Sequence, residues 1–382
     1  MRFIVNSQLF AQQLQLMSGV ITNNNTIPII NCFYFHMEGN VLTLRATDLE
    51  TTLVSKMELD TADVEDLADI AVPSKLLMDA VKSLPDTPLT FNTNAETYSV
   101  ELSWSSGKCS LAGQSTDTFP VMPTLADTQT TVVPSSVLAE AIGKTSFAVS
   151  TDVLRPQMAG IYMELTPEQM TVVATDAHRL VRYRRNDVVS EIPTSFILPR
   201  KPVTMVKNIL ARYKEEIEVT MQYNTTNVSF AFENIFVVCR LVEGKYPNFD
   251  AAIPKENPNR LTVDRATFLS ALRRVSLFAN QSTRQVRFSI GDRELVIMAE
   301  DLEFSTNAKE TIPCSFEGQP MEIGFNSSFV IEMLNNLASE NVRIEMSHPG
   351  RAGIIFPDFT DQEEQSKDDI LMLVMPVMLN NQ

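Results

Sequence analysis

The segment of this sequence whose residue types could carry out chemistry is T-D-A-H-R-L at Thr175–Leu180. An aspartate two residues before a histidine could orient that histidine as a general base. The chain has only two other histidines, His36 and His348, and it has no serine or cysteine in a recognisable nucleophile context. An enzyme that uses Asp176 and His178 is therefore one hypothesis for this protein.

Other common kinds of chemical site lack their sequence signatures. Glycine is scarce, at 12 residues, and the chain contains neither G-x-G-x-x-G nor a P-loop, which argues against those nucleotide sites. No apolar run approaches the roughly 18 residues of a membrane span, and the N-terminus lacks a signal-peptide pattern. We expect a reduced, cytoplasmic protein with no metal, cofactor or membrane partner, because the four cysteines are scattered: Cys32, Cys109, Cys239 and Cys314.

A short pattern occurs three times along the chain. The segments R-F-I-V-N-S-Q-L-F, V-V-P-S-S-V-L and L-T-V-D-R-A-T-F-L each combine an apolar strand, a polar or capping residue and a helical pattern. A second landmark, L-T-L-R-A-T-D, M-T-V-V-A-T-D or L-V-I-M-A-E-D, ends at Asp48, Asp176 and Asp301. An aspartate present in all three copies is typical of a structural turn, whereas His178 and Arg179 occur only in the middle copy.

The repeats divide the chain into three domains of similar size, which its 382 residues also favour because single cores rarely exceed about 250–300 residues. We place the domains at residues 1–127, 128–258 and 259–382. Within each third, apolar residues alternate along short runs, which predicts antiparallel strands, and two helical patterns interrupt them. The expected class is α+β, with helices packed on antiparallel sheets.

The charge pattern suggests where the chain meets its partners. With 31 basic and 47 acidic residues, the net charge of −16 argues at first against nucleic acid. However, the helices expected at 7–18, 73–84, 135–146, 200–214, 265–278 and 327–338 carry +8, and the rest of the chain carries −24. A segregated basic face is typical of a surface that meets phosphates. The alternative is that these lysine-rich and arginine-rich helix faces are simply solvated.

Several short motifs appear in a specific order together with the threefold repeat. They are A-T-D-x-H-R-L at Ala174–Leu180, L-P-R-K at Leu198–Lys201, L-V-E-G-K-Y-P-N-F at Leu241–Phe249, M-E-I-G-F-N at Met321–Asn326, E-N-V-R at Glu340–Arg343 and V-M-P at Val374–Pro376. In these motifs, and over its whole length, the chain resembles the β sliding clamp of bacterial DNA polymerase III.

The resemblance implies a function as well as a fold. It implies a head-to-tail homodimer that closes a ring of six domains around double-stranded DNA without reading its sequence. Such a ring is a non-catalytic processivity factor for the DNA polymerase III catalytic subunit. It also binds the clamp loader and repair proteins through short linear peptides. The competing hypothesis of another class is a monomeric repeat scaffold that binds peptides without encircling DNA.

The resemblance also carries site residues over to this chain. The expected peptide-binding pocket consists of Met158, Thr175, His178, Arg179, Leu180, Pro247, Asn326, Phe329, Leu373, Val374, Met375 and Pro376. The alternative for its last members is a final core strand, and both interpretations can hold together. The tail Asn380–Gln382 extends beyond the usual end of the family chain, and we expect it to approach the pocket mouth.

Two further surfaces are expected. The candidate DNA contacts are Lys75, Lys82, Arg155, Arg200, Lys201, Lys207, Arg273 and Arg274. The expected dimer interface joins an edge strand of the first domain to the third domain through Lys108, Cys109, Leu111, Leu277 and Phe278. For Leu277 and Phe278, ordinary core packing is the alternative.

Overall fold

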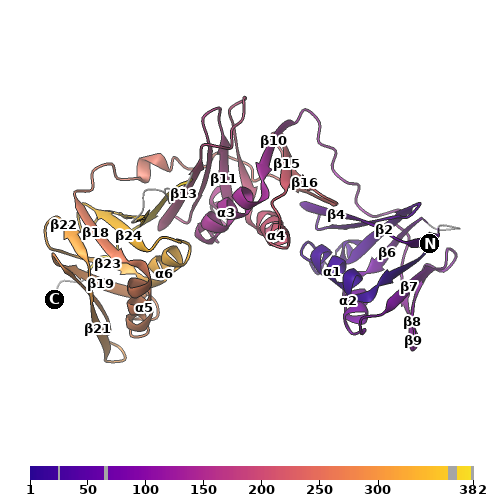
Figure 1. Cartoon of the computed structure of the whole chain (residues 1–382), viewed down its shortest axis with the longest axis horizontal. Helices are drawn as coiled ribbons and strands as arrows, with labels where there is room; N and C mark the ends of the chain where they lie inside the picture. Colours follow the sequence, from indigo (N-terminus) through magenta and orange to yellow (C-terminus); the bar gives the residue numbers. More distant parts are fainter. Residues whose placement is uncertain (25, 64–67, 360–367, 380–382) are drawn as a thin grey trace. The chain divides into compact units, whose positions relative to one another are not determined.

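The computed structural model describes residues 1–24, 26–63, 68–359 and 368–379. It forms two compact units, of which the first contains Met1–Ala139 and Lys201–Leu241 and the second contains Glu140–Arg200 and Val242–Gln382 (Figure 1). All strand pairs between the named strands of the described residues are antiparallel, which agrees with the alternating apolar pattern of the sequence.

Six α-helices occur in the described residues, one at each position that the sequence predicts. They are α1 (Ser7–Met17), α2 (Ser74–Lys82), α3 (Ser135–Thr145), α4 (Arg200–Leu210), α5 (Arg265–Ser276) and α6 (Ser327–Asn335). Four short 3-10 helices accompany them: η1 (Pro28–Asn31), η2 (Ser146–Ala148), η3 (Pro156–Met158) and η4 (Asp250–Ala252). None of the described helices is long and apolar enough to cross a membrane.

Polar residues at the strand ends start the helices, as the repeated pattern predicts. The Asn6 side chain accepts hydrogen bonds from the backbone N–H groups of Gln8 and Leu9, and so satisfies donors that a helix start leaves unpaired. Asp264 and Asn326 do the same for α5 and α6. In the first unit α1 packs against α2, and in the second unit α5 packs against α6.

The first unit contains a five-stranded and an eight-stranded sheet. In spatial order the smaller sheet consists of β5 (Thr61–Asp63), β1 (Arg2–Asn6), β7 (Pro88–Thr93), β8 (Ser99–Trp104) and β9 (Gly107–Ala112). The larger sheet consists of β10 (Gln129–Pro134), β15 (Glu218–Tyr223), β16 (Asn227–Phe232), β17 (Ile235–Arg240), β4 (Thr51–Glu58), β3 (Val41–Thr47), β2 (Cys32–Glu38) and β6 (Asp69–Pro73).

The second unit contains a nine-stranded and a four-stranded sheet. The larger consists of β14 (Thr194–Pro199), β11 (Gly160–Leu165), β12 (Met170–Thr175), β13 (Arg179–Arg185), β26 (Asp368–Val374), β25 (Gly353–Asp358), β24 (Asn341–Met346), β18 (Asn259–Asp264) and β22 (Ser315–Glu317). The smaller consists of β21 (Thr306–Pro313), β20 (Glu294–Asp301), β19 (Gln285–Ile290) and β23 (Met321–Asn326).

Each of the two largest sheets joins strands from two different thirds of the chain. In the first unit β17 of the middle third pairs with β4 of the first third, from Ile235 opposite Ser55 to Cys239 opposite Thr51. In the second unit β26 of the last third pairs with β13 of the middle third, where Arg179 lies opposite Val374. Continuous hydrogen-bonded sheets therefore run through both junctions between thirds.

The three repeated aspartates all shape turns, as the repeat predicts. Asp48 accepts a hydrogen bond from the backbone N–H of Thr51, and Asp176 accepts one from that of Arg179. Asp301 accepts hydrogen bonds from the backbone N–H groups of Glu303 and Phe304. The carboxylates thus satisfy backbone donors of the turn that precedes the following strand or of that strand's first residue, which is the structural role that their recurrence indicates.

Several helices end two to four residues before their predicted ends, and the largest difference, in the fourth helix, changes the charge balance of the helices. The fourth helix ends at Leu210 rather than at residue 214, and Tyr213 packs edge-on against the Phe232 ring of β16 at 6.1 Å. Leu210 is the last buried apolar residue of the helix, and the helix ends there. Arg212 and Lys214 therefore lie outside α4, and the six helices contain nine basic and three acidic residues, a net charge of +6.

The core of the first third is built on aromatic contacts around α1. Phe10 is fully buried, and its ring meets those of Phe3, Phe35 and Phe91 at centroid distances of 6.0, 6.3 and 6.4 Å. These rings come from α1, β1, β2 and β7, so they fix the helix on both sheets of the first unit.

We predict that Phe10→Ala lowers the free energy of unfolding of the first third by about 3–5 kcal/mol, because it leaves a cavity among three rings. Leu9→Ala, at an exposed neighbouring position of α1, is the matched control and changes it by less than about 0.5 kcal/mol. Urea unfolding followed by the fluorescence of Trp104, the only tryptophan, measures both. Equal effects of the two variants would contradict this account of the core.

Candidate functional site

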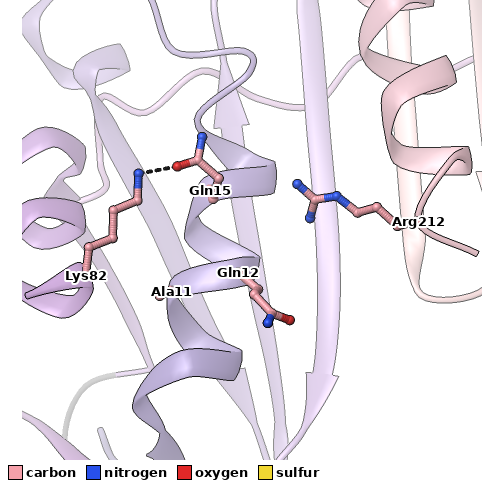
Figure 2. Close-up of a pocket in the computed structure, with 5 residues that line it drawn as sticks. All are labelled: Ala11, Gln12, Gln15, Lys82 and Arg212. Atoms are coloured by element: carbon pink, nitrogen blue, oxygen red, sulfur yellow. Dashed lines mark hydrogen bonds between the residues drawn. The ribbon is translucent and has the colours of Figure 1, made fainter. Parts of the chain in front are cut away.

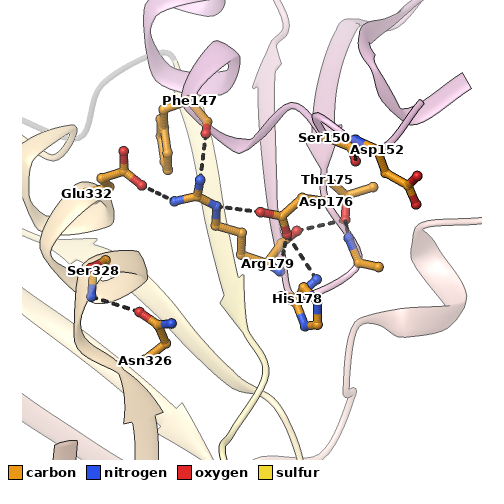
Figure 3. A network of polar contacts seen from close by, with 11 residues as sticks. Phe147, Ser150, Asp152, Thr175, Asp176, His178, Arg179, Asn326, Ser328 and Glu332 are labelled. Carbon is orange, nitrogen blue, oxygen red and sulfur yellow. Dashed lines mark hydrogen bonds and ion pairs between the residues drawn. The ribbon is translucent and has the colours of Figure 1, made fainter. Parts of the chain in front are cut away.

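The turn between β12 and β13 holds a buried arginine at the centre of a polar network (Figure 3). Arg179 is only 8% exposed. Its Nε donates to Asp176 at 3.0 Å, one terminal nitrogen donates to the Phe147 carbonyl at 2.8 Å, and the other donates to Glu332 of α6. Burial of a guanidinium is costly without such partners, so the network stabilises the charge inside the protein.

Aromatic rings complete the surroundings of this arginine. The Arg179 guanidinium lies 4.6 Å from the ring centroid of Phe329 and 5.4 Å from that of Phe147. The exposed His178 ring is stacked with Phe329 at 6.2 Å and an interplanar angle of 21°. Arg179 thus connects the middle third to α6 of the last third through charge, hydrogen bonds and ring faces.

The antiparallel pairing of β13 with β26 brings the apolar segment near the end of the chain next to Arg179. Leu180 lies opposite Leu373, and both are buried in one cluster with Tyr246. Met375, just beyond the strand, is partly exposed and donates its backbone N–H to the carbonyl of His178 at 2.8 Å. The segment is therefore a core strand through Val374 and a surface segment from Met375 onward, which confirms the core-strand interpretation, and the peptide-binding interpretation stays a prediction.

The remaining expected pocket residues lie around this ladder. Met158 is buried in η3, and Thr175 ends β12 with its hydroxyl donating to the Arg179 carbonyl at 2.7 Å. Pro247 is exposed directly after Tyr246. Asn326 caps α6, the helix that carries Phe329. The contacts join His178, Arg179, Phe329 and Met375 directly, whereas Asn326 acts on the site only through its helix.

The chain beyond Met375 lies along the edge of β23. Val377 donates its backbone N–H to the carbonyl of Gly324 at 2.8 Å. A Cβ atom on Gly324 would meet the Val377 carbonyl oxygen at 2.6 Å and the Leu379 side chain at 2.7 Å, so only glycine allows this approach. The expectation that Asn380–Gln382 approach the pocket concerns residues outside the described ranges.

Two partners of Arg179 were missed by the sequence analysis. Phe147 contributes its carbonyl and its ring, and Glu332 contributes the carboxylate. Glu332 is the only charged residue of α6, which is a signal that could have singled it out. Phe147 has no such signal, because a backbone carbonyl can come from any residue type.

The geometry removes the basis for the enzyme hypothesis. The Asp176 carboxylate accepts hydrogen bonds from the backbone N–H groups of His178 and Arg179 and from the Arg179 guanidinium, so it orients a turn. In the part of the chain that the structure describes, no group of three or more His, Cys, Asp or Glu side chains could hold a metal ion.

The candidate DNA-contacting cations differ in their partners. Arg155 pairs with Asp152 at 2.8 Å, and Lys201 pairs with Asp48 at 2.7 Å. Arg274 donates two hydrogen bonds to Glu310, which lowers the pKa of that carboxyl below its usual value. Arg273 and Lys82 donate to the side-chain oxygens of Asn335 and Gln15. Arg200 is exposed, as is Lys75, and Lys207 is half-buried.

Two of the eight strands at sheet ends bear on the expected dimer interface. β9 is the last strand of the five-stranded sheet, and β21 is the last strand of the four-stranded sheet. Lys108, Cys109 and Leu111 belong to β9, and Lys108 pairs with Glu101 of the neighbouring strand.

An apolar surface accompanies the free edge of β21. Leu277 is 81% exposed and Phe278 is 42% exposed, which excludes core packing for these two side chains in the described chain. The hairpin between β20 and β21 adds Leu302 and Phe304, which are 70% and 67% exposed and which the sequence analysis missed. We call Leu277, Phe278, Leu302 and Phe304 the β21 apolar patch.

The chain is similar to known proteins over nearly its whole length. The family descriptions that match are the N-terminal, central and C-terminal domains of the DNA polymerase III beta subunit, at residues 1–123, 132–248 and 250–376. The beta sliding clamps of Vibrio cholerae and Pseudomonas putida KT2440 are 28% and 26% identical to the chain, each over 99% of this chain and 100% of the relative.

A solved structure agrees over the same length. The sliding clamp of Pseudomonas aeruginosa bound to griselimycin is 25% identical and matches with a TM-score of 0.91, over 99% of this chain and 100% of that chain. Repeated helix pairs on antiparallel sheets thus define a sliding-clamp fold. The chain belongs to the DNA polymerase III beta subunit family, which is a non-catalytic processivity factor.

We predict that Arg179→Ala destabilises the chain by about 2–4 kcal/mol, because it removes a buried cation and leaves Asp176 without its charged partner. Arg155→Ala, which breaks only the exposed pair with Asp152, is the matched control and costs less than about 1 kcal/mol. Urea unfolding followed by far-ultraviolet circular dichroism measures both. A similar, small effect of the two substitutions would contradict a structural role for the network.

Proposed function

We propose that two copies of this chain close head to tail into a ring that encircles duplex DNA and tethers a replicative polymerase to it. The observation that carries this proposal is the repeated use of two strand positions. In each third, one strand follows the aspartate turn, and this strand pairs with the last strand of the next third. The pairs are β4 with β17 and β13 with β26.

The same rule leaves one strand of each kind without a partner. β21 is the strand that follows the turn at Asp301 in the last third, and β9 is the last strand of the first third. By the same rule these two strands would be partners. Each has a free edge in its sheet. Pairing of β21 in one copy with β9 in a second copy would continue the sheet at two equivalent joints. This heterologous contact closes at two subunits and so gives a ring instead of a filament.

The exposed side chains support the same joint. The β21 apolar patch lies at the turn before β21 and at the end of α5, where burial against a second copy would remove it from water. Lys108, Cys109 and Leu111 of β9 would form the opposite side. Three domains per chain, at residues 1–127, 128–258 and 259–382, would then contribute six to the ring.

The charge distribution supports a ring that slides. The helices carry a net charge of +6 while the whole chain carries −16, so attraction to phosphates is concentrated on the helices. The candidate contacts Lys75, Lys82, Arg155, Arg200, Lys201, Lys207, Arg273 and Arg274 would meet the backbone without reading bases. The acidic remainder would keep DNA from binding the outer surface.

We also propose that the surface around His178, Phe329 and Met375 binds short linear peptides from the polymerase, the clamp loader and repair proteins. Exposed ring and thioether groups above a buried aliphatic cluster give apolar contacts, and the nearby turn gives polar groups that orient a peptide. Methionine suits such a surface because its flexible side chain adapts to different partners. We place this activity in the cytoplasm, where DNA is replicated in bacteria.

The ring is tested by retention on DNA. We expect the dimer, loaded by a clamp loader onto nicked circular plasmid, to remain bound during gel filtration and to be lost after the plasmid is linearised. Leu277→Asp should give a 43-kDa monomer in sedimentation and no retention, because a charge replaces an exposed apolar contact. Val121→Asp, at an exposed position outside both strands, is the control. Equal retention on circular and linear DNA would refute the topological mechanism and favour a peptide-binding scaffold.

The peptide surface is tested by substitution of its exposed histidine. We expect His178→Ala to weaken binding of a fluorescent short linear peptide from the polymerase catalytic subunit by about 10-fold, since it removes a ring from the surface. His348→Ala, at another exposed histidine, should leave binding unchanged. Fluorescence anisotropy measures both affinities, and dimerisation should be unaffected. Equal affinities for the two variants would place the peptide elsewhere.

A further inference from the structure

Two exposed lysines lie on strands and not on the helices of the proposed DNA surface. Lys82 is typical of the helix cations, since it lines a cavity beside α1 and donates to the side-chain oxygen of Gln15 (Figure 2). Lys108 belongs instead to β9 and Lys309 to β21, the two strands that the proposed joint brings together. The pairing at the two internal junctions determines where these two lysines would meet.

Both internal junctions use the same register. At the first junction Arg240 donates its backbone N–H to the carbonyl of Glu50 at 2.9 Å. At the second junction Met375 donates its backbone N–H to the carbonyl of His178 at 2.8 Å. Glu50 and His178 are each the second residue after the repeated aspartate, so the last strand of the next third is aligned with the aspartate turn in the same way both times.

β9 aligns with β17 through the hairpins that contain them. A two-residue turn connects each of these strands to the strand before it, and Gly107 and Ile235 are the first residues after the turn. Equal positions after the turn are equivalent positions in the repeat. Lys108 of β9 therefore corresponds to Phe236 of β17.

β21 aligns with β4 through the strands that precede them. In β3 and in β20 the alanine two residues before the repeated aspartate is buried, and it lies opposite Leu53 of β4 and Ala308 of β21, respectively. Leu53 and Ala308 are therefore equivalent. The residues that follow them, Val54 and Lys309, are equivalent as well.

The two alignments together place Lys108 of one copy directly opposite Lys309 of the second copy. At the first internal junction the equivalent pair is Phe236 opposite Val54, and at the second it is a leucine opposite an arginine. Neither internal junction thus has like charges at this position. Like charges directly opposite each other destabilise an antiparallel pair of strands.

The carboxylates near these lysines do not remove the repulsion. Lys108 pairs with Glu101 of β8 at 2.9 Å, but the two side chains are 70% and 40% exposed, so water screens that pair. Lys309 is exposed and has no carboxylate partner among the described residues. Glu300 of β20 lies opposite Asn307, two positions along the strand from Lys309, so it is only a diagonal neighbour.

We propose that Lys108 of each copy and Lys309 of the other form a like-charge pair across both joints of the ring, and that this pair limits how tightly the two copies associate. This inference rests on the proposed function and gives two residues of the joint a destabilising role. Because dissolved salt screens exposed charges, the penalty from the pair is largest at low ionic strength. The two lysines thus act against the apolar contacts of the same joint.

The register is tested with the native thiol of Cys109, which would lie opposite Ala308 of the second copy. Ala308→Cys supplies a facing thiol, and diamide, which takes up the hydrogen atoms of both thiols, should then produce a disulfide-linked dimer on a non-reducing gel. Asn307→Cys, one residue away on the other face of β21, is the matched control and should not be linked. Cys109→Ser in the Ala308→Cys chain should abolish the link, which excludes Cys314 as the partner.

The effect of the charges is tested by reversing one of them. We expect Lys309→Glu to tighten the dimer about 3- to 10-fold at low NaCl concentration, because repulsion at two joints becomes attraction. Arg293→Glu, at an exposed position between β19 and β20 of the same sheet, changes the net charge equally and is the matched control. Sedimentation equilibrium measures the dissociation constants. The gain should disappear at high NaCl concentration, and also in a Lys108→Gln chain, which lacks the opposing charge.

The outcomes separate the two proposals. If the wild type sediments only as a monomer, the ring is wrong and this inference is wrong with it. If the wild type is a dimer but Ala308→Cys is not linked, the register is wrong and the ring stands. If Ala308→Cys is linked but Lys309→Glu and Arg293→Glu have equal dissociation constants, the strands pair as described and the lysines do not limit the association.

Discussion

Antiparallel strand pairing across the junctions between thirds is the constraint on which the rest of the structure depends. A free sheet edge presents unpaired N–H and C=O groups, and pairing with the neighbouring third satisfies them. The β17–β4 and β13–β26 ladders do this inside one chain. β9 and β21 are among the strands with an unpaired edge in their sheets. The chemistry that joins domains within the chain therefore also explains how two chains could join.

The β13–β26 ladder also builds the candidate peptide surface. It brings the turn at Asp176 next to the chain end at Met375, although nearly 200 residues separate them in the sequence. Arg179 then fixes α6 against this turn through Glu332 and Phe329. Because its partners come from three elements, the arginine is satisfied only when all three are in place, so the surface and the packing of the second unit form together.

Charge is segregated between the helices and the rest of the chain, because the helices carry +6 and the whole chain carries −16. Helix caps use uncharged or acidic side chains such as Asn6 and Asp264, while the basic residues of the helices lie in α2, α3, α4 and α5. Pairing of Arg274 with Glu310 and of Lys201 with Asp48 reduces the free charge that a count of cations would suggest. The local field of the helices therefore depends on which cations the fold leaves unpaired.

The sequence alone determined the threefold repeat, the α+β class, six helices and the structural role of Asp176, because periodicity, capping residues and recurrence act over short distances. Only the tertiary structure decided that α4 ends at Leu210, that Glu332 and Phe147 hold Arg179, and that Leu277 and Phe278 are exposed. These outcomes depend on which distant segments meet. No local pattern encodes which partner a buried charge will find or which edge of a sheet remains free.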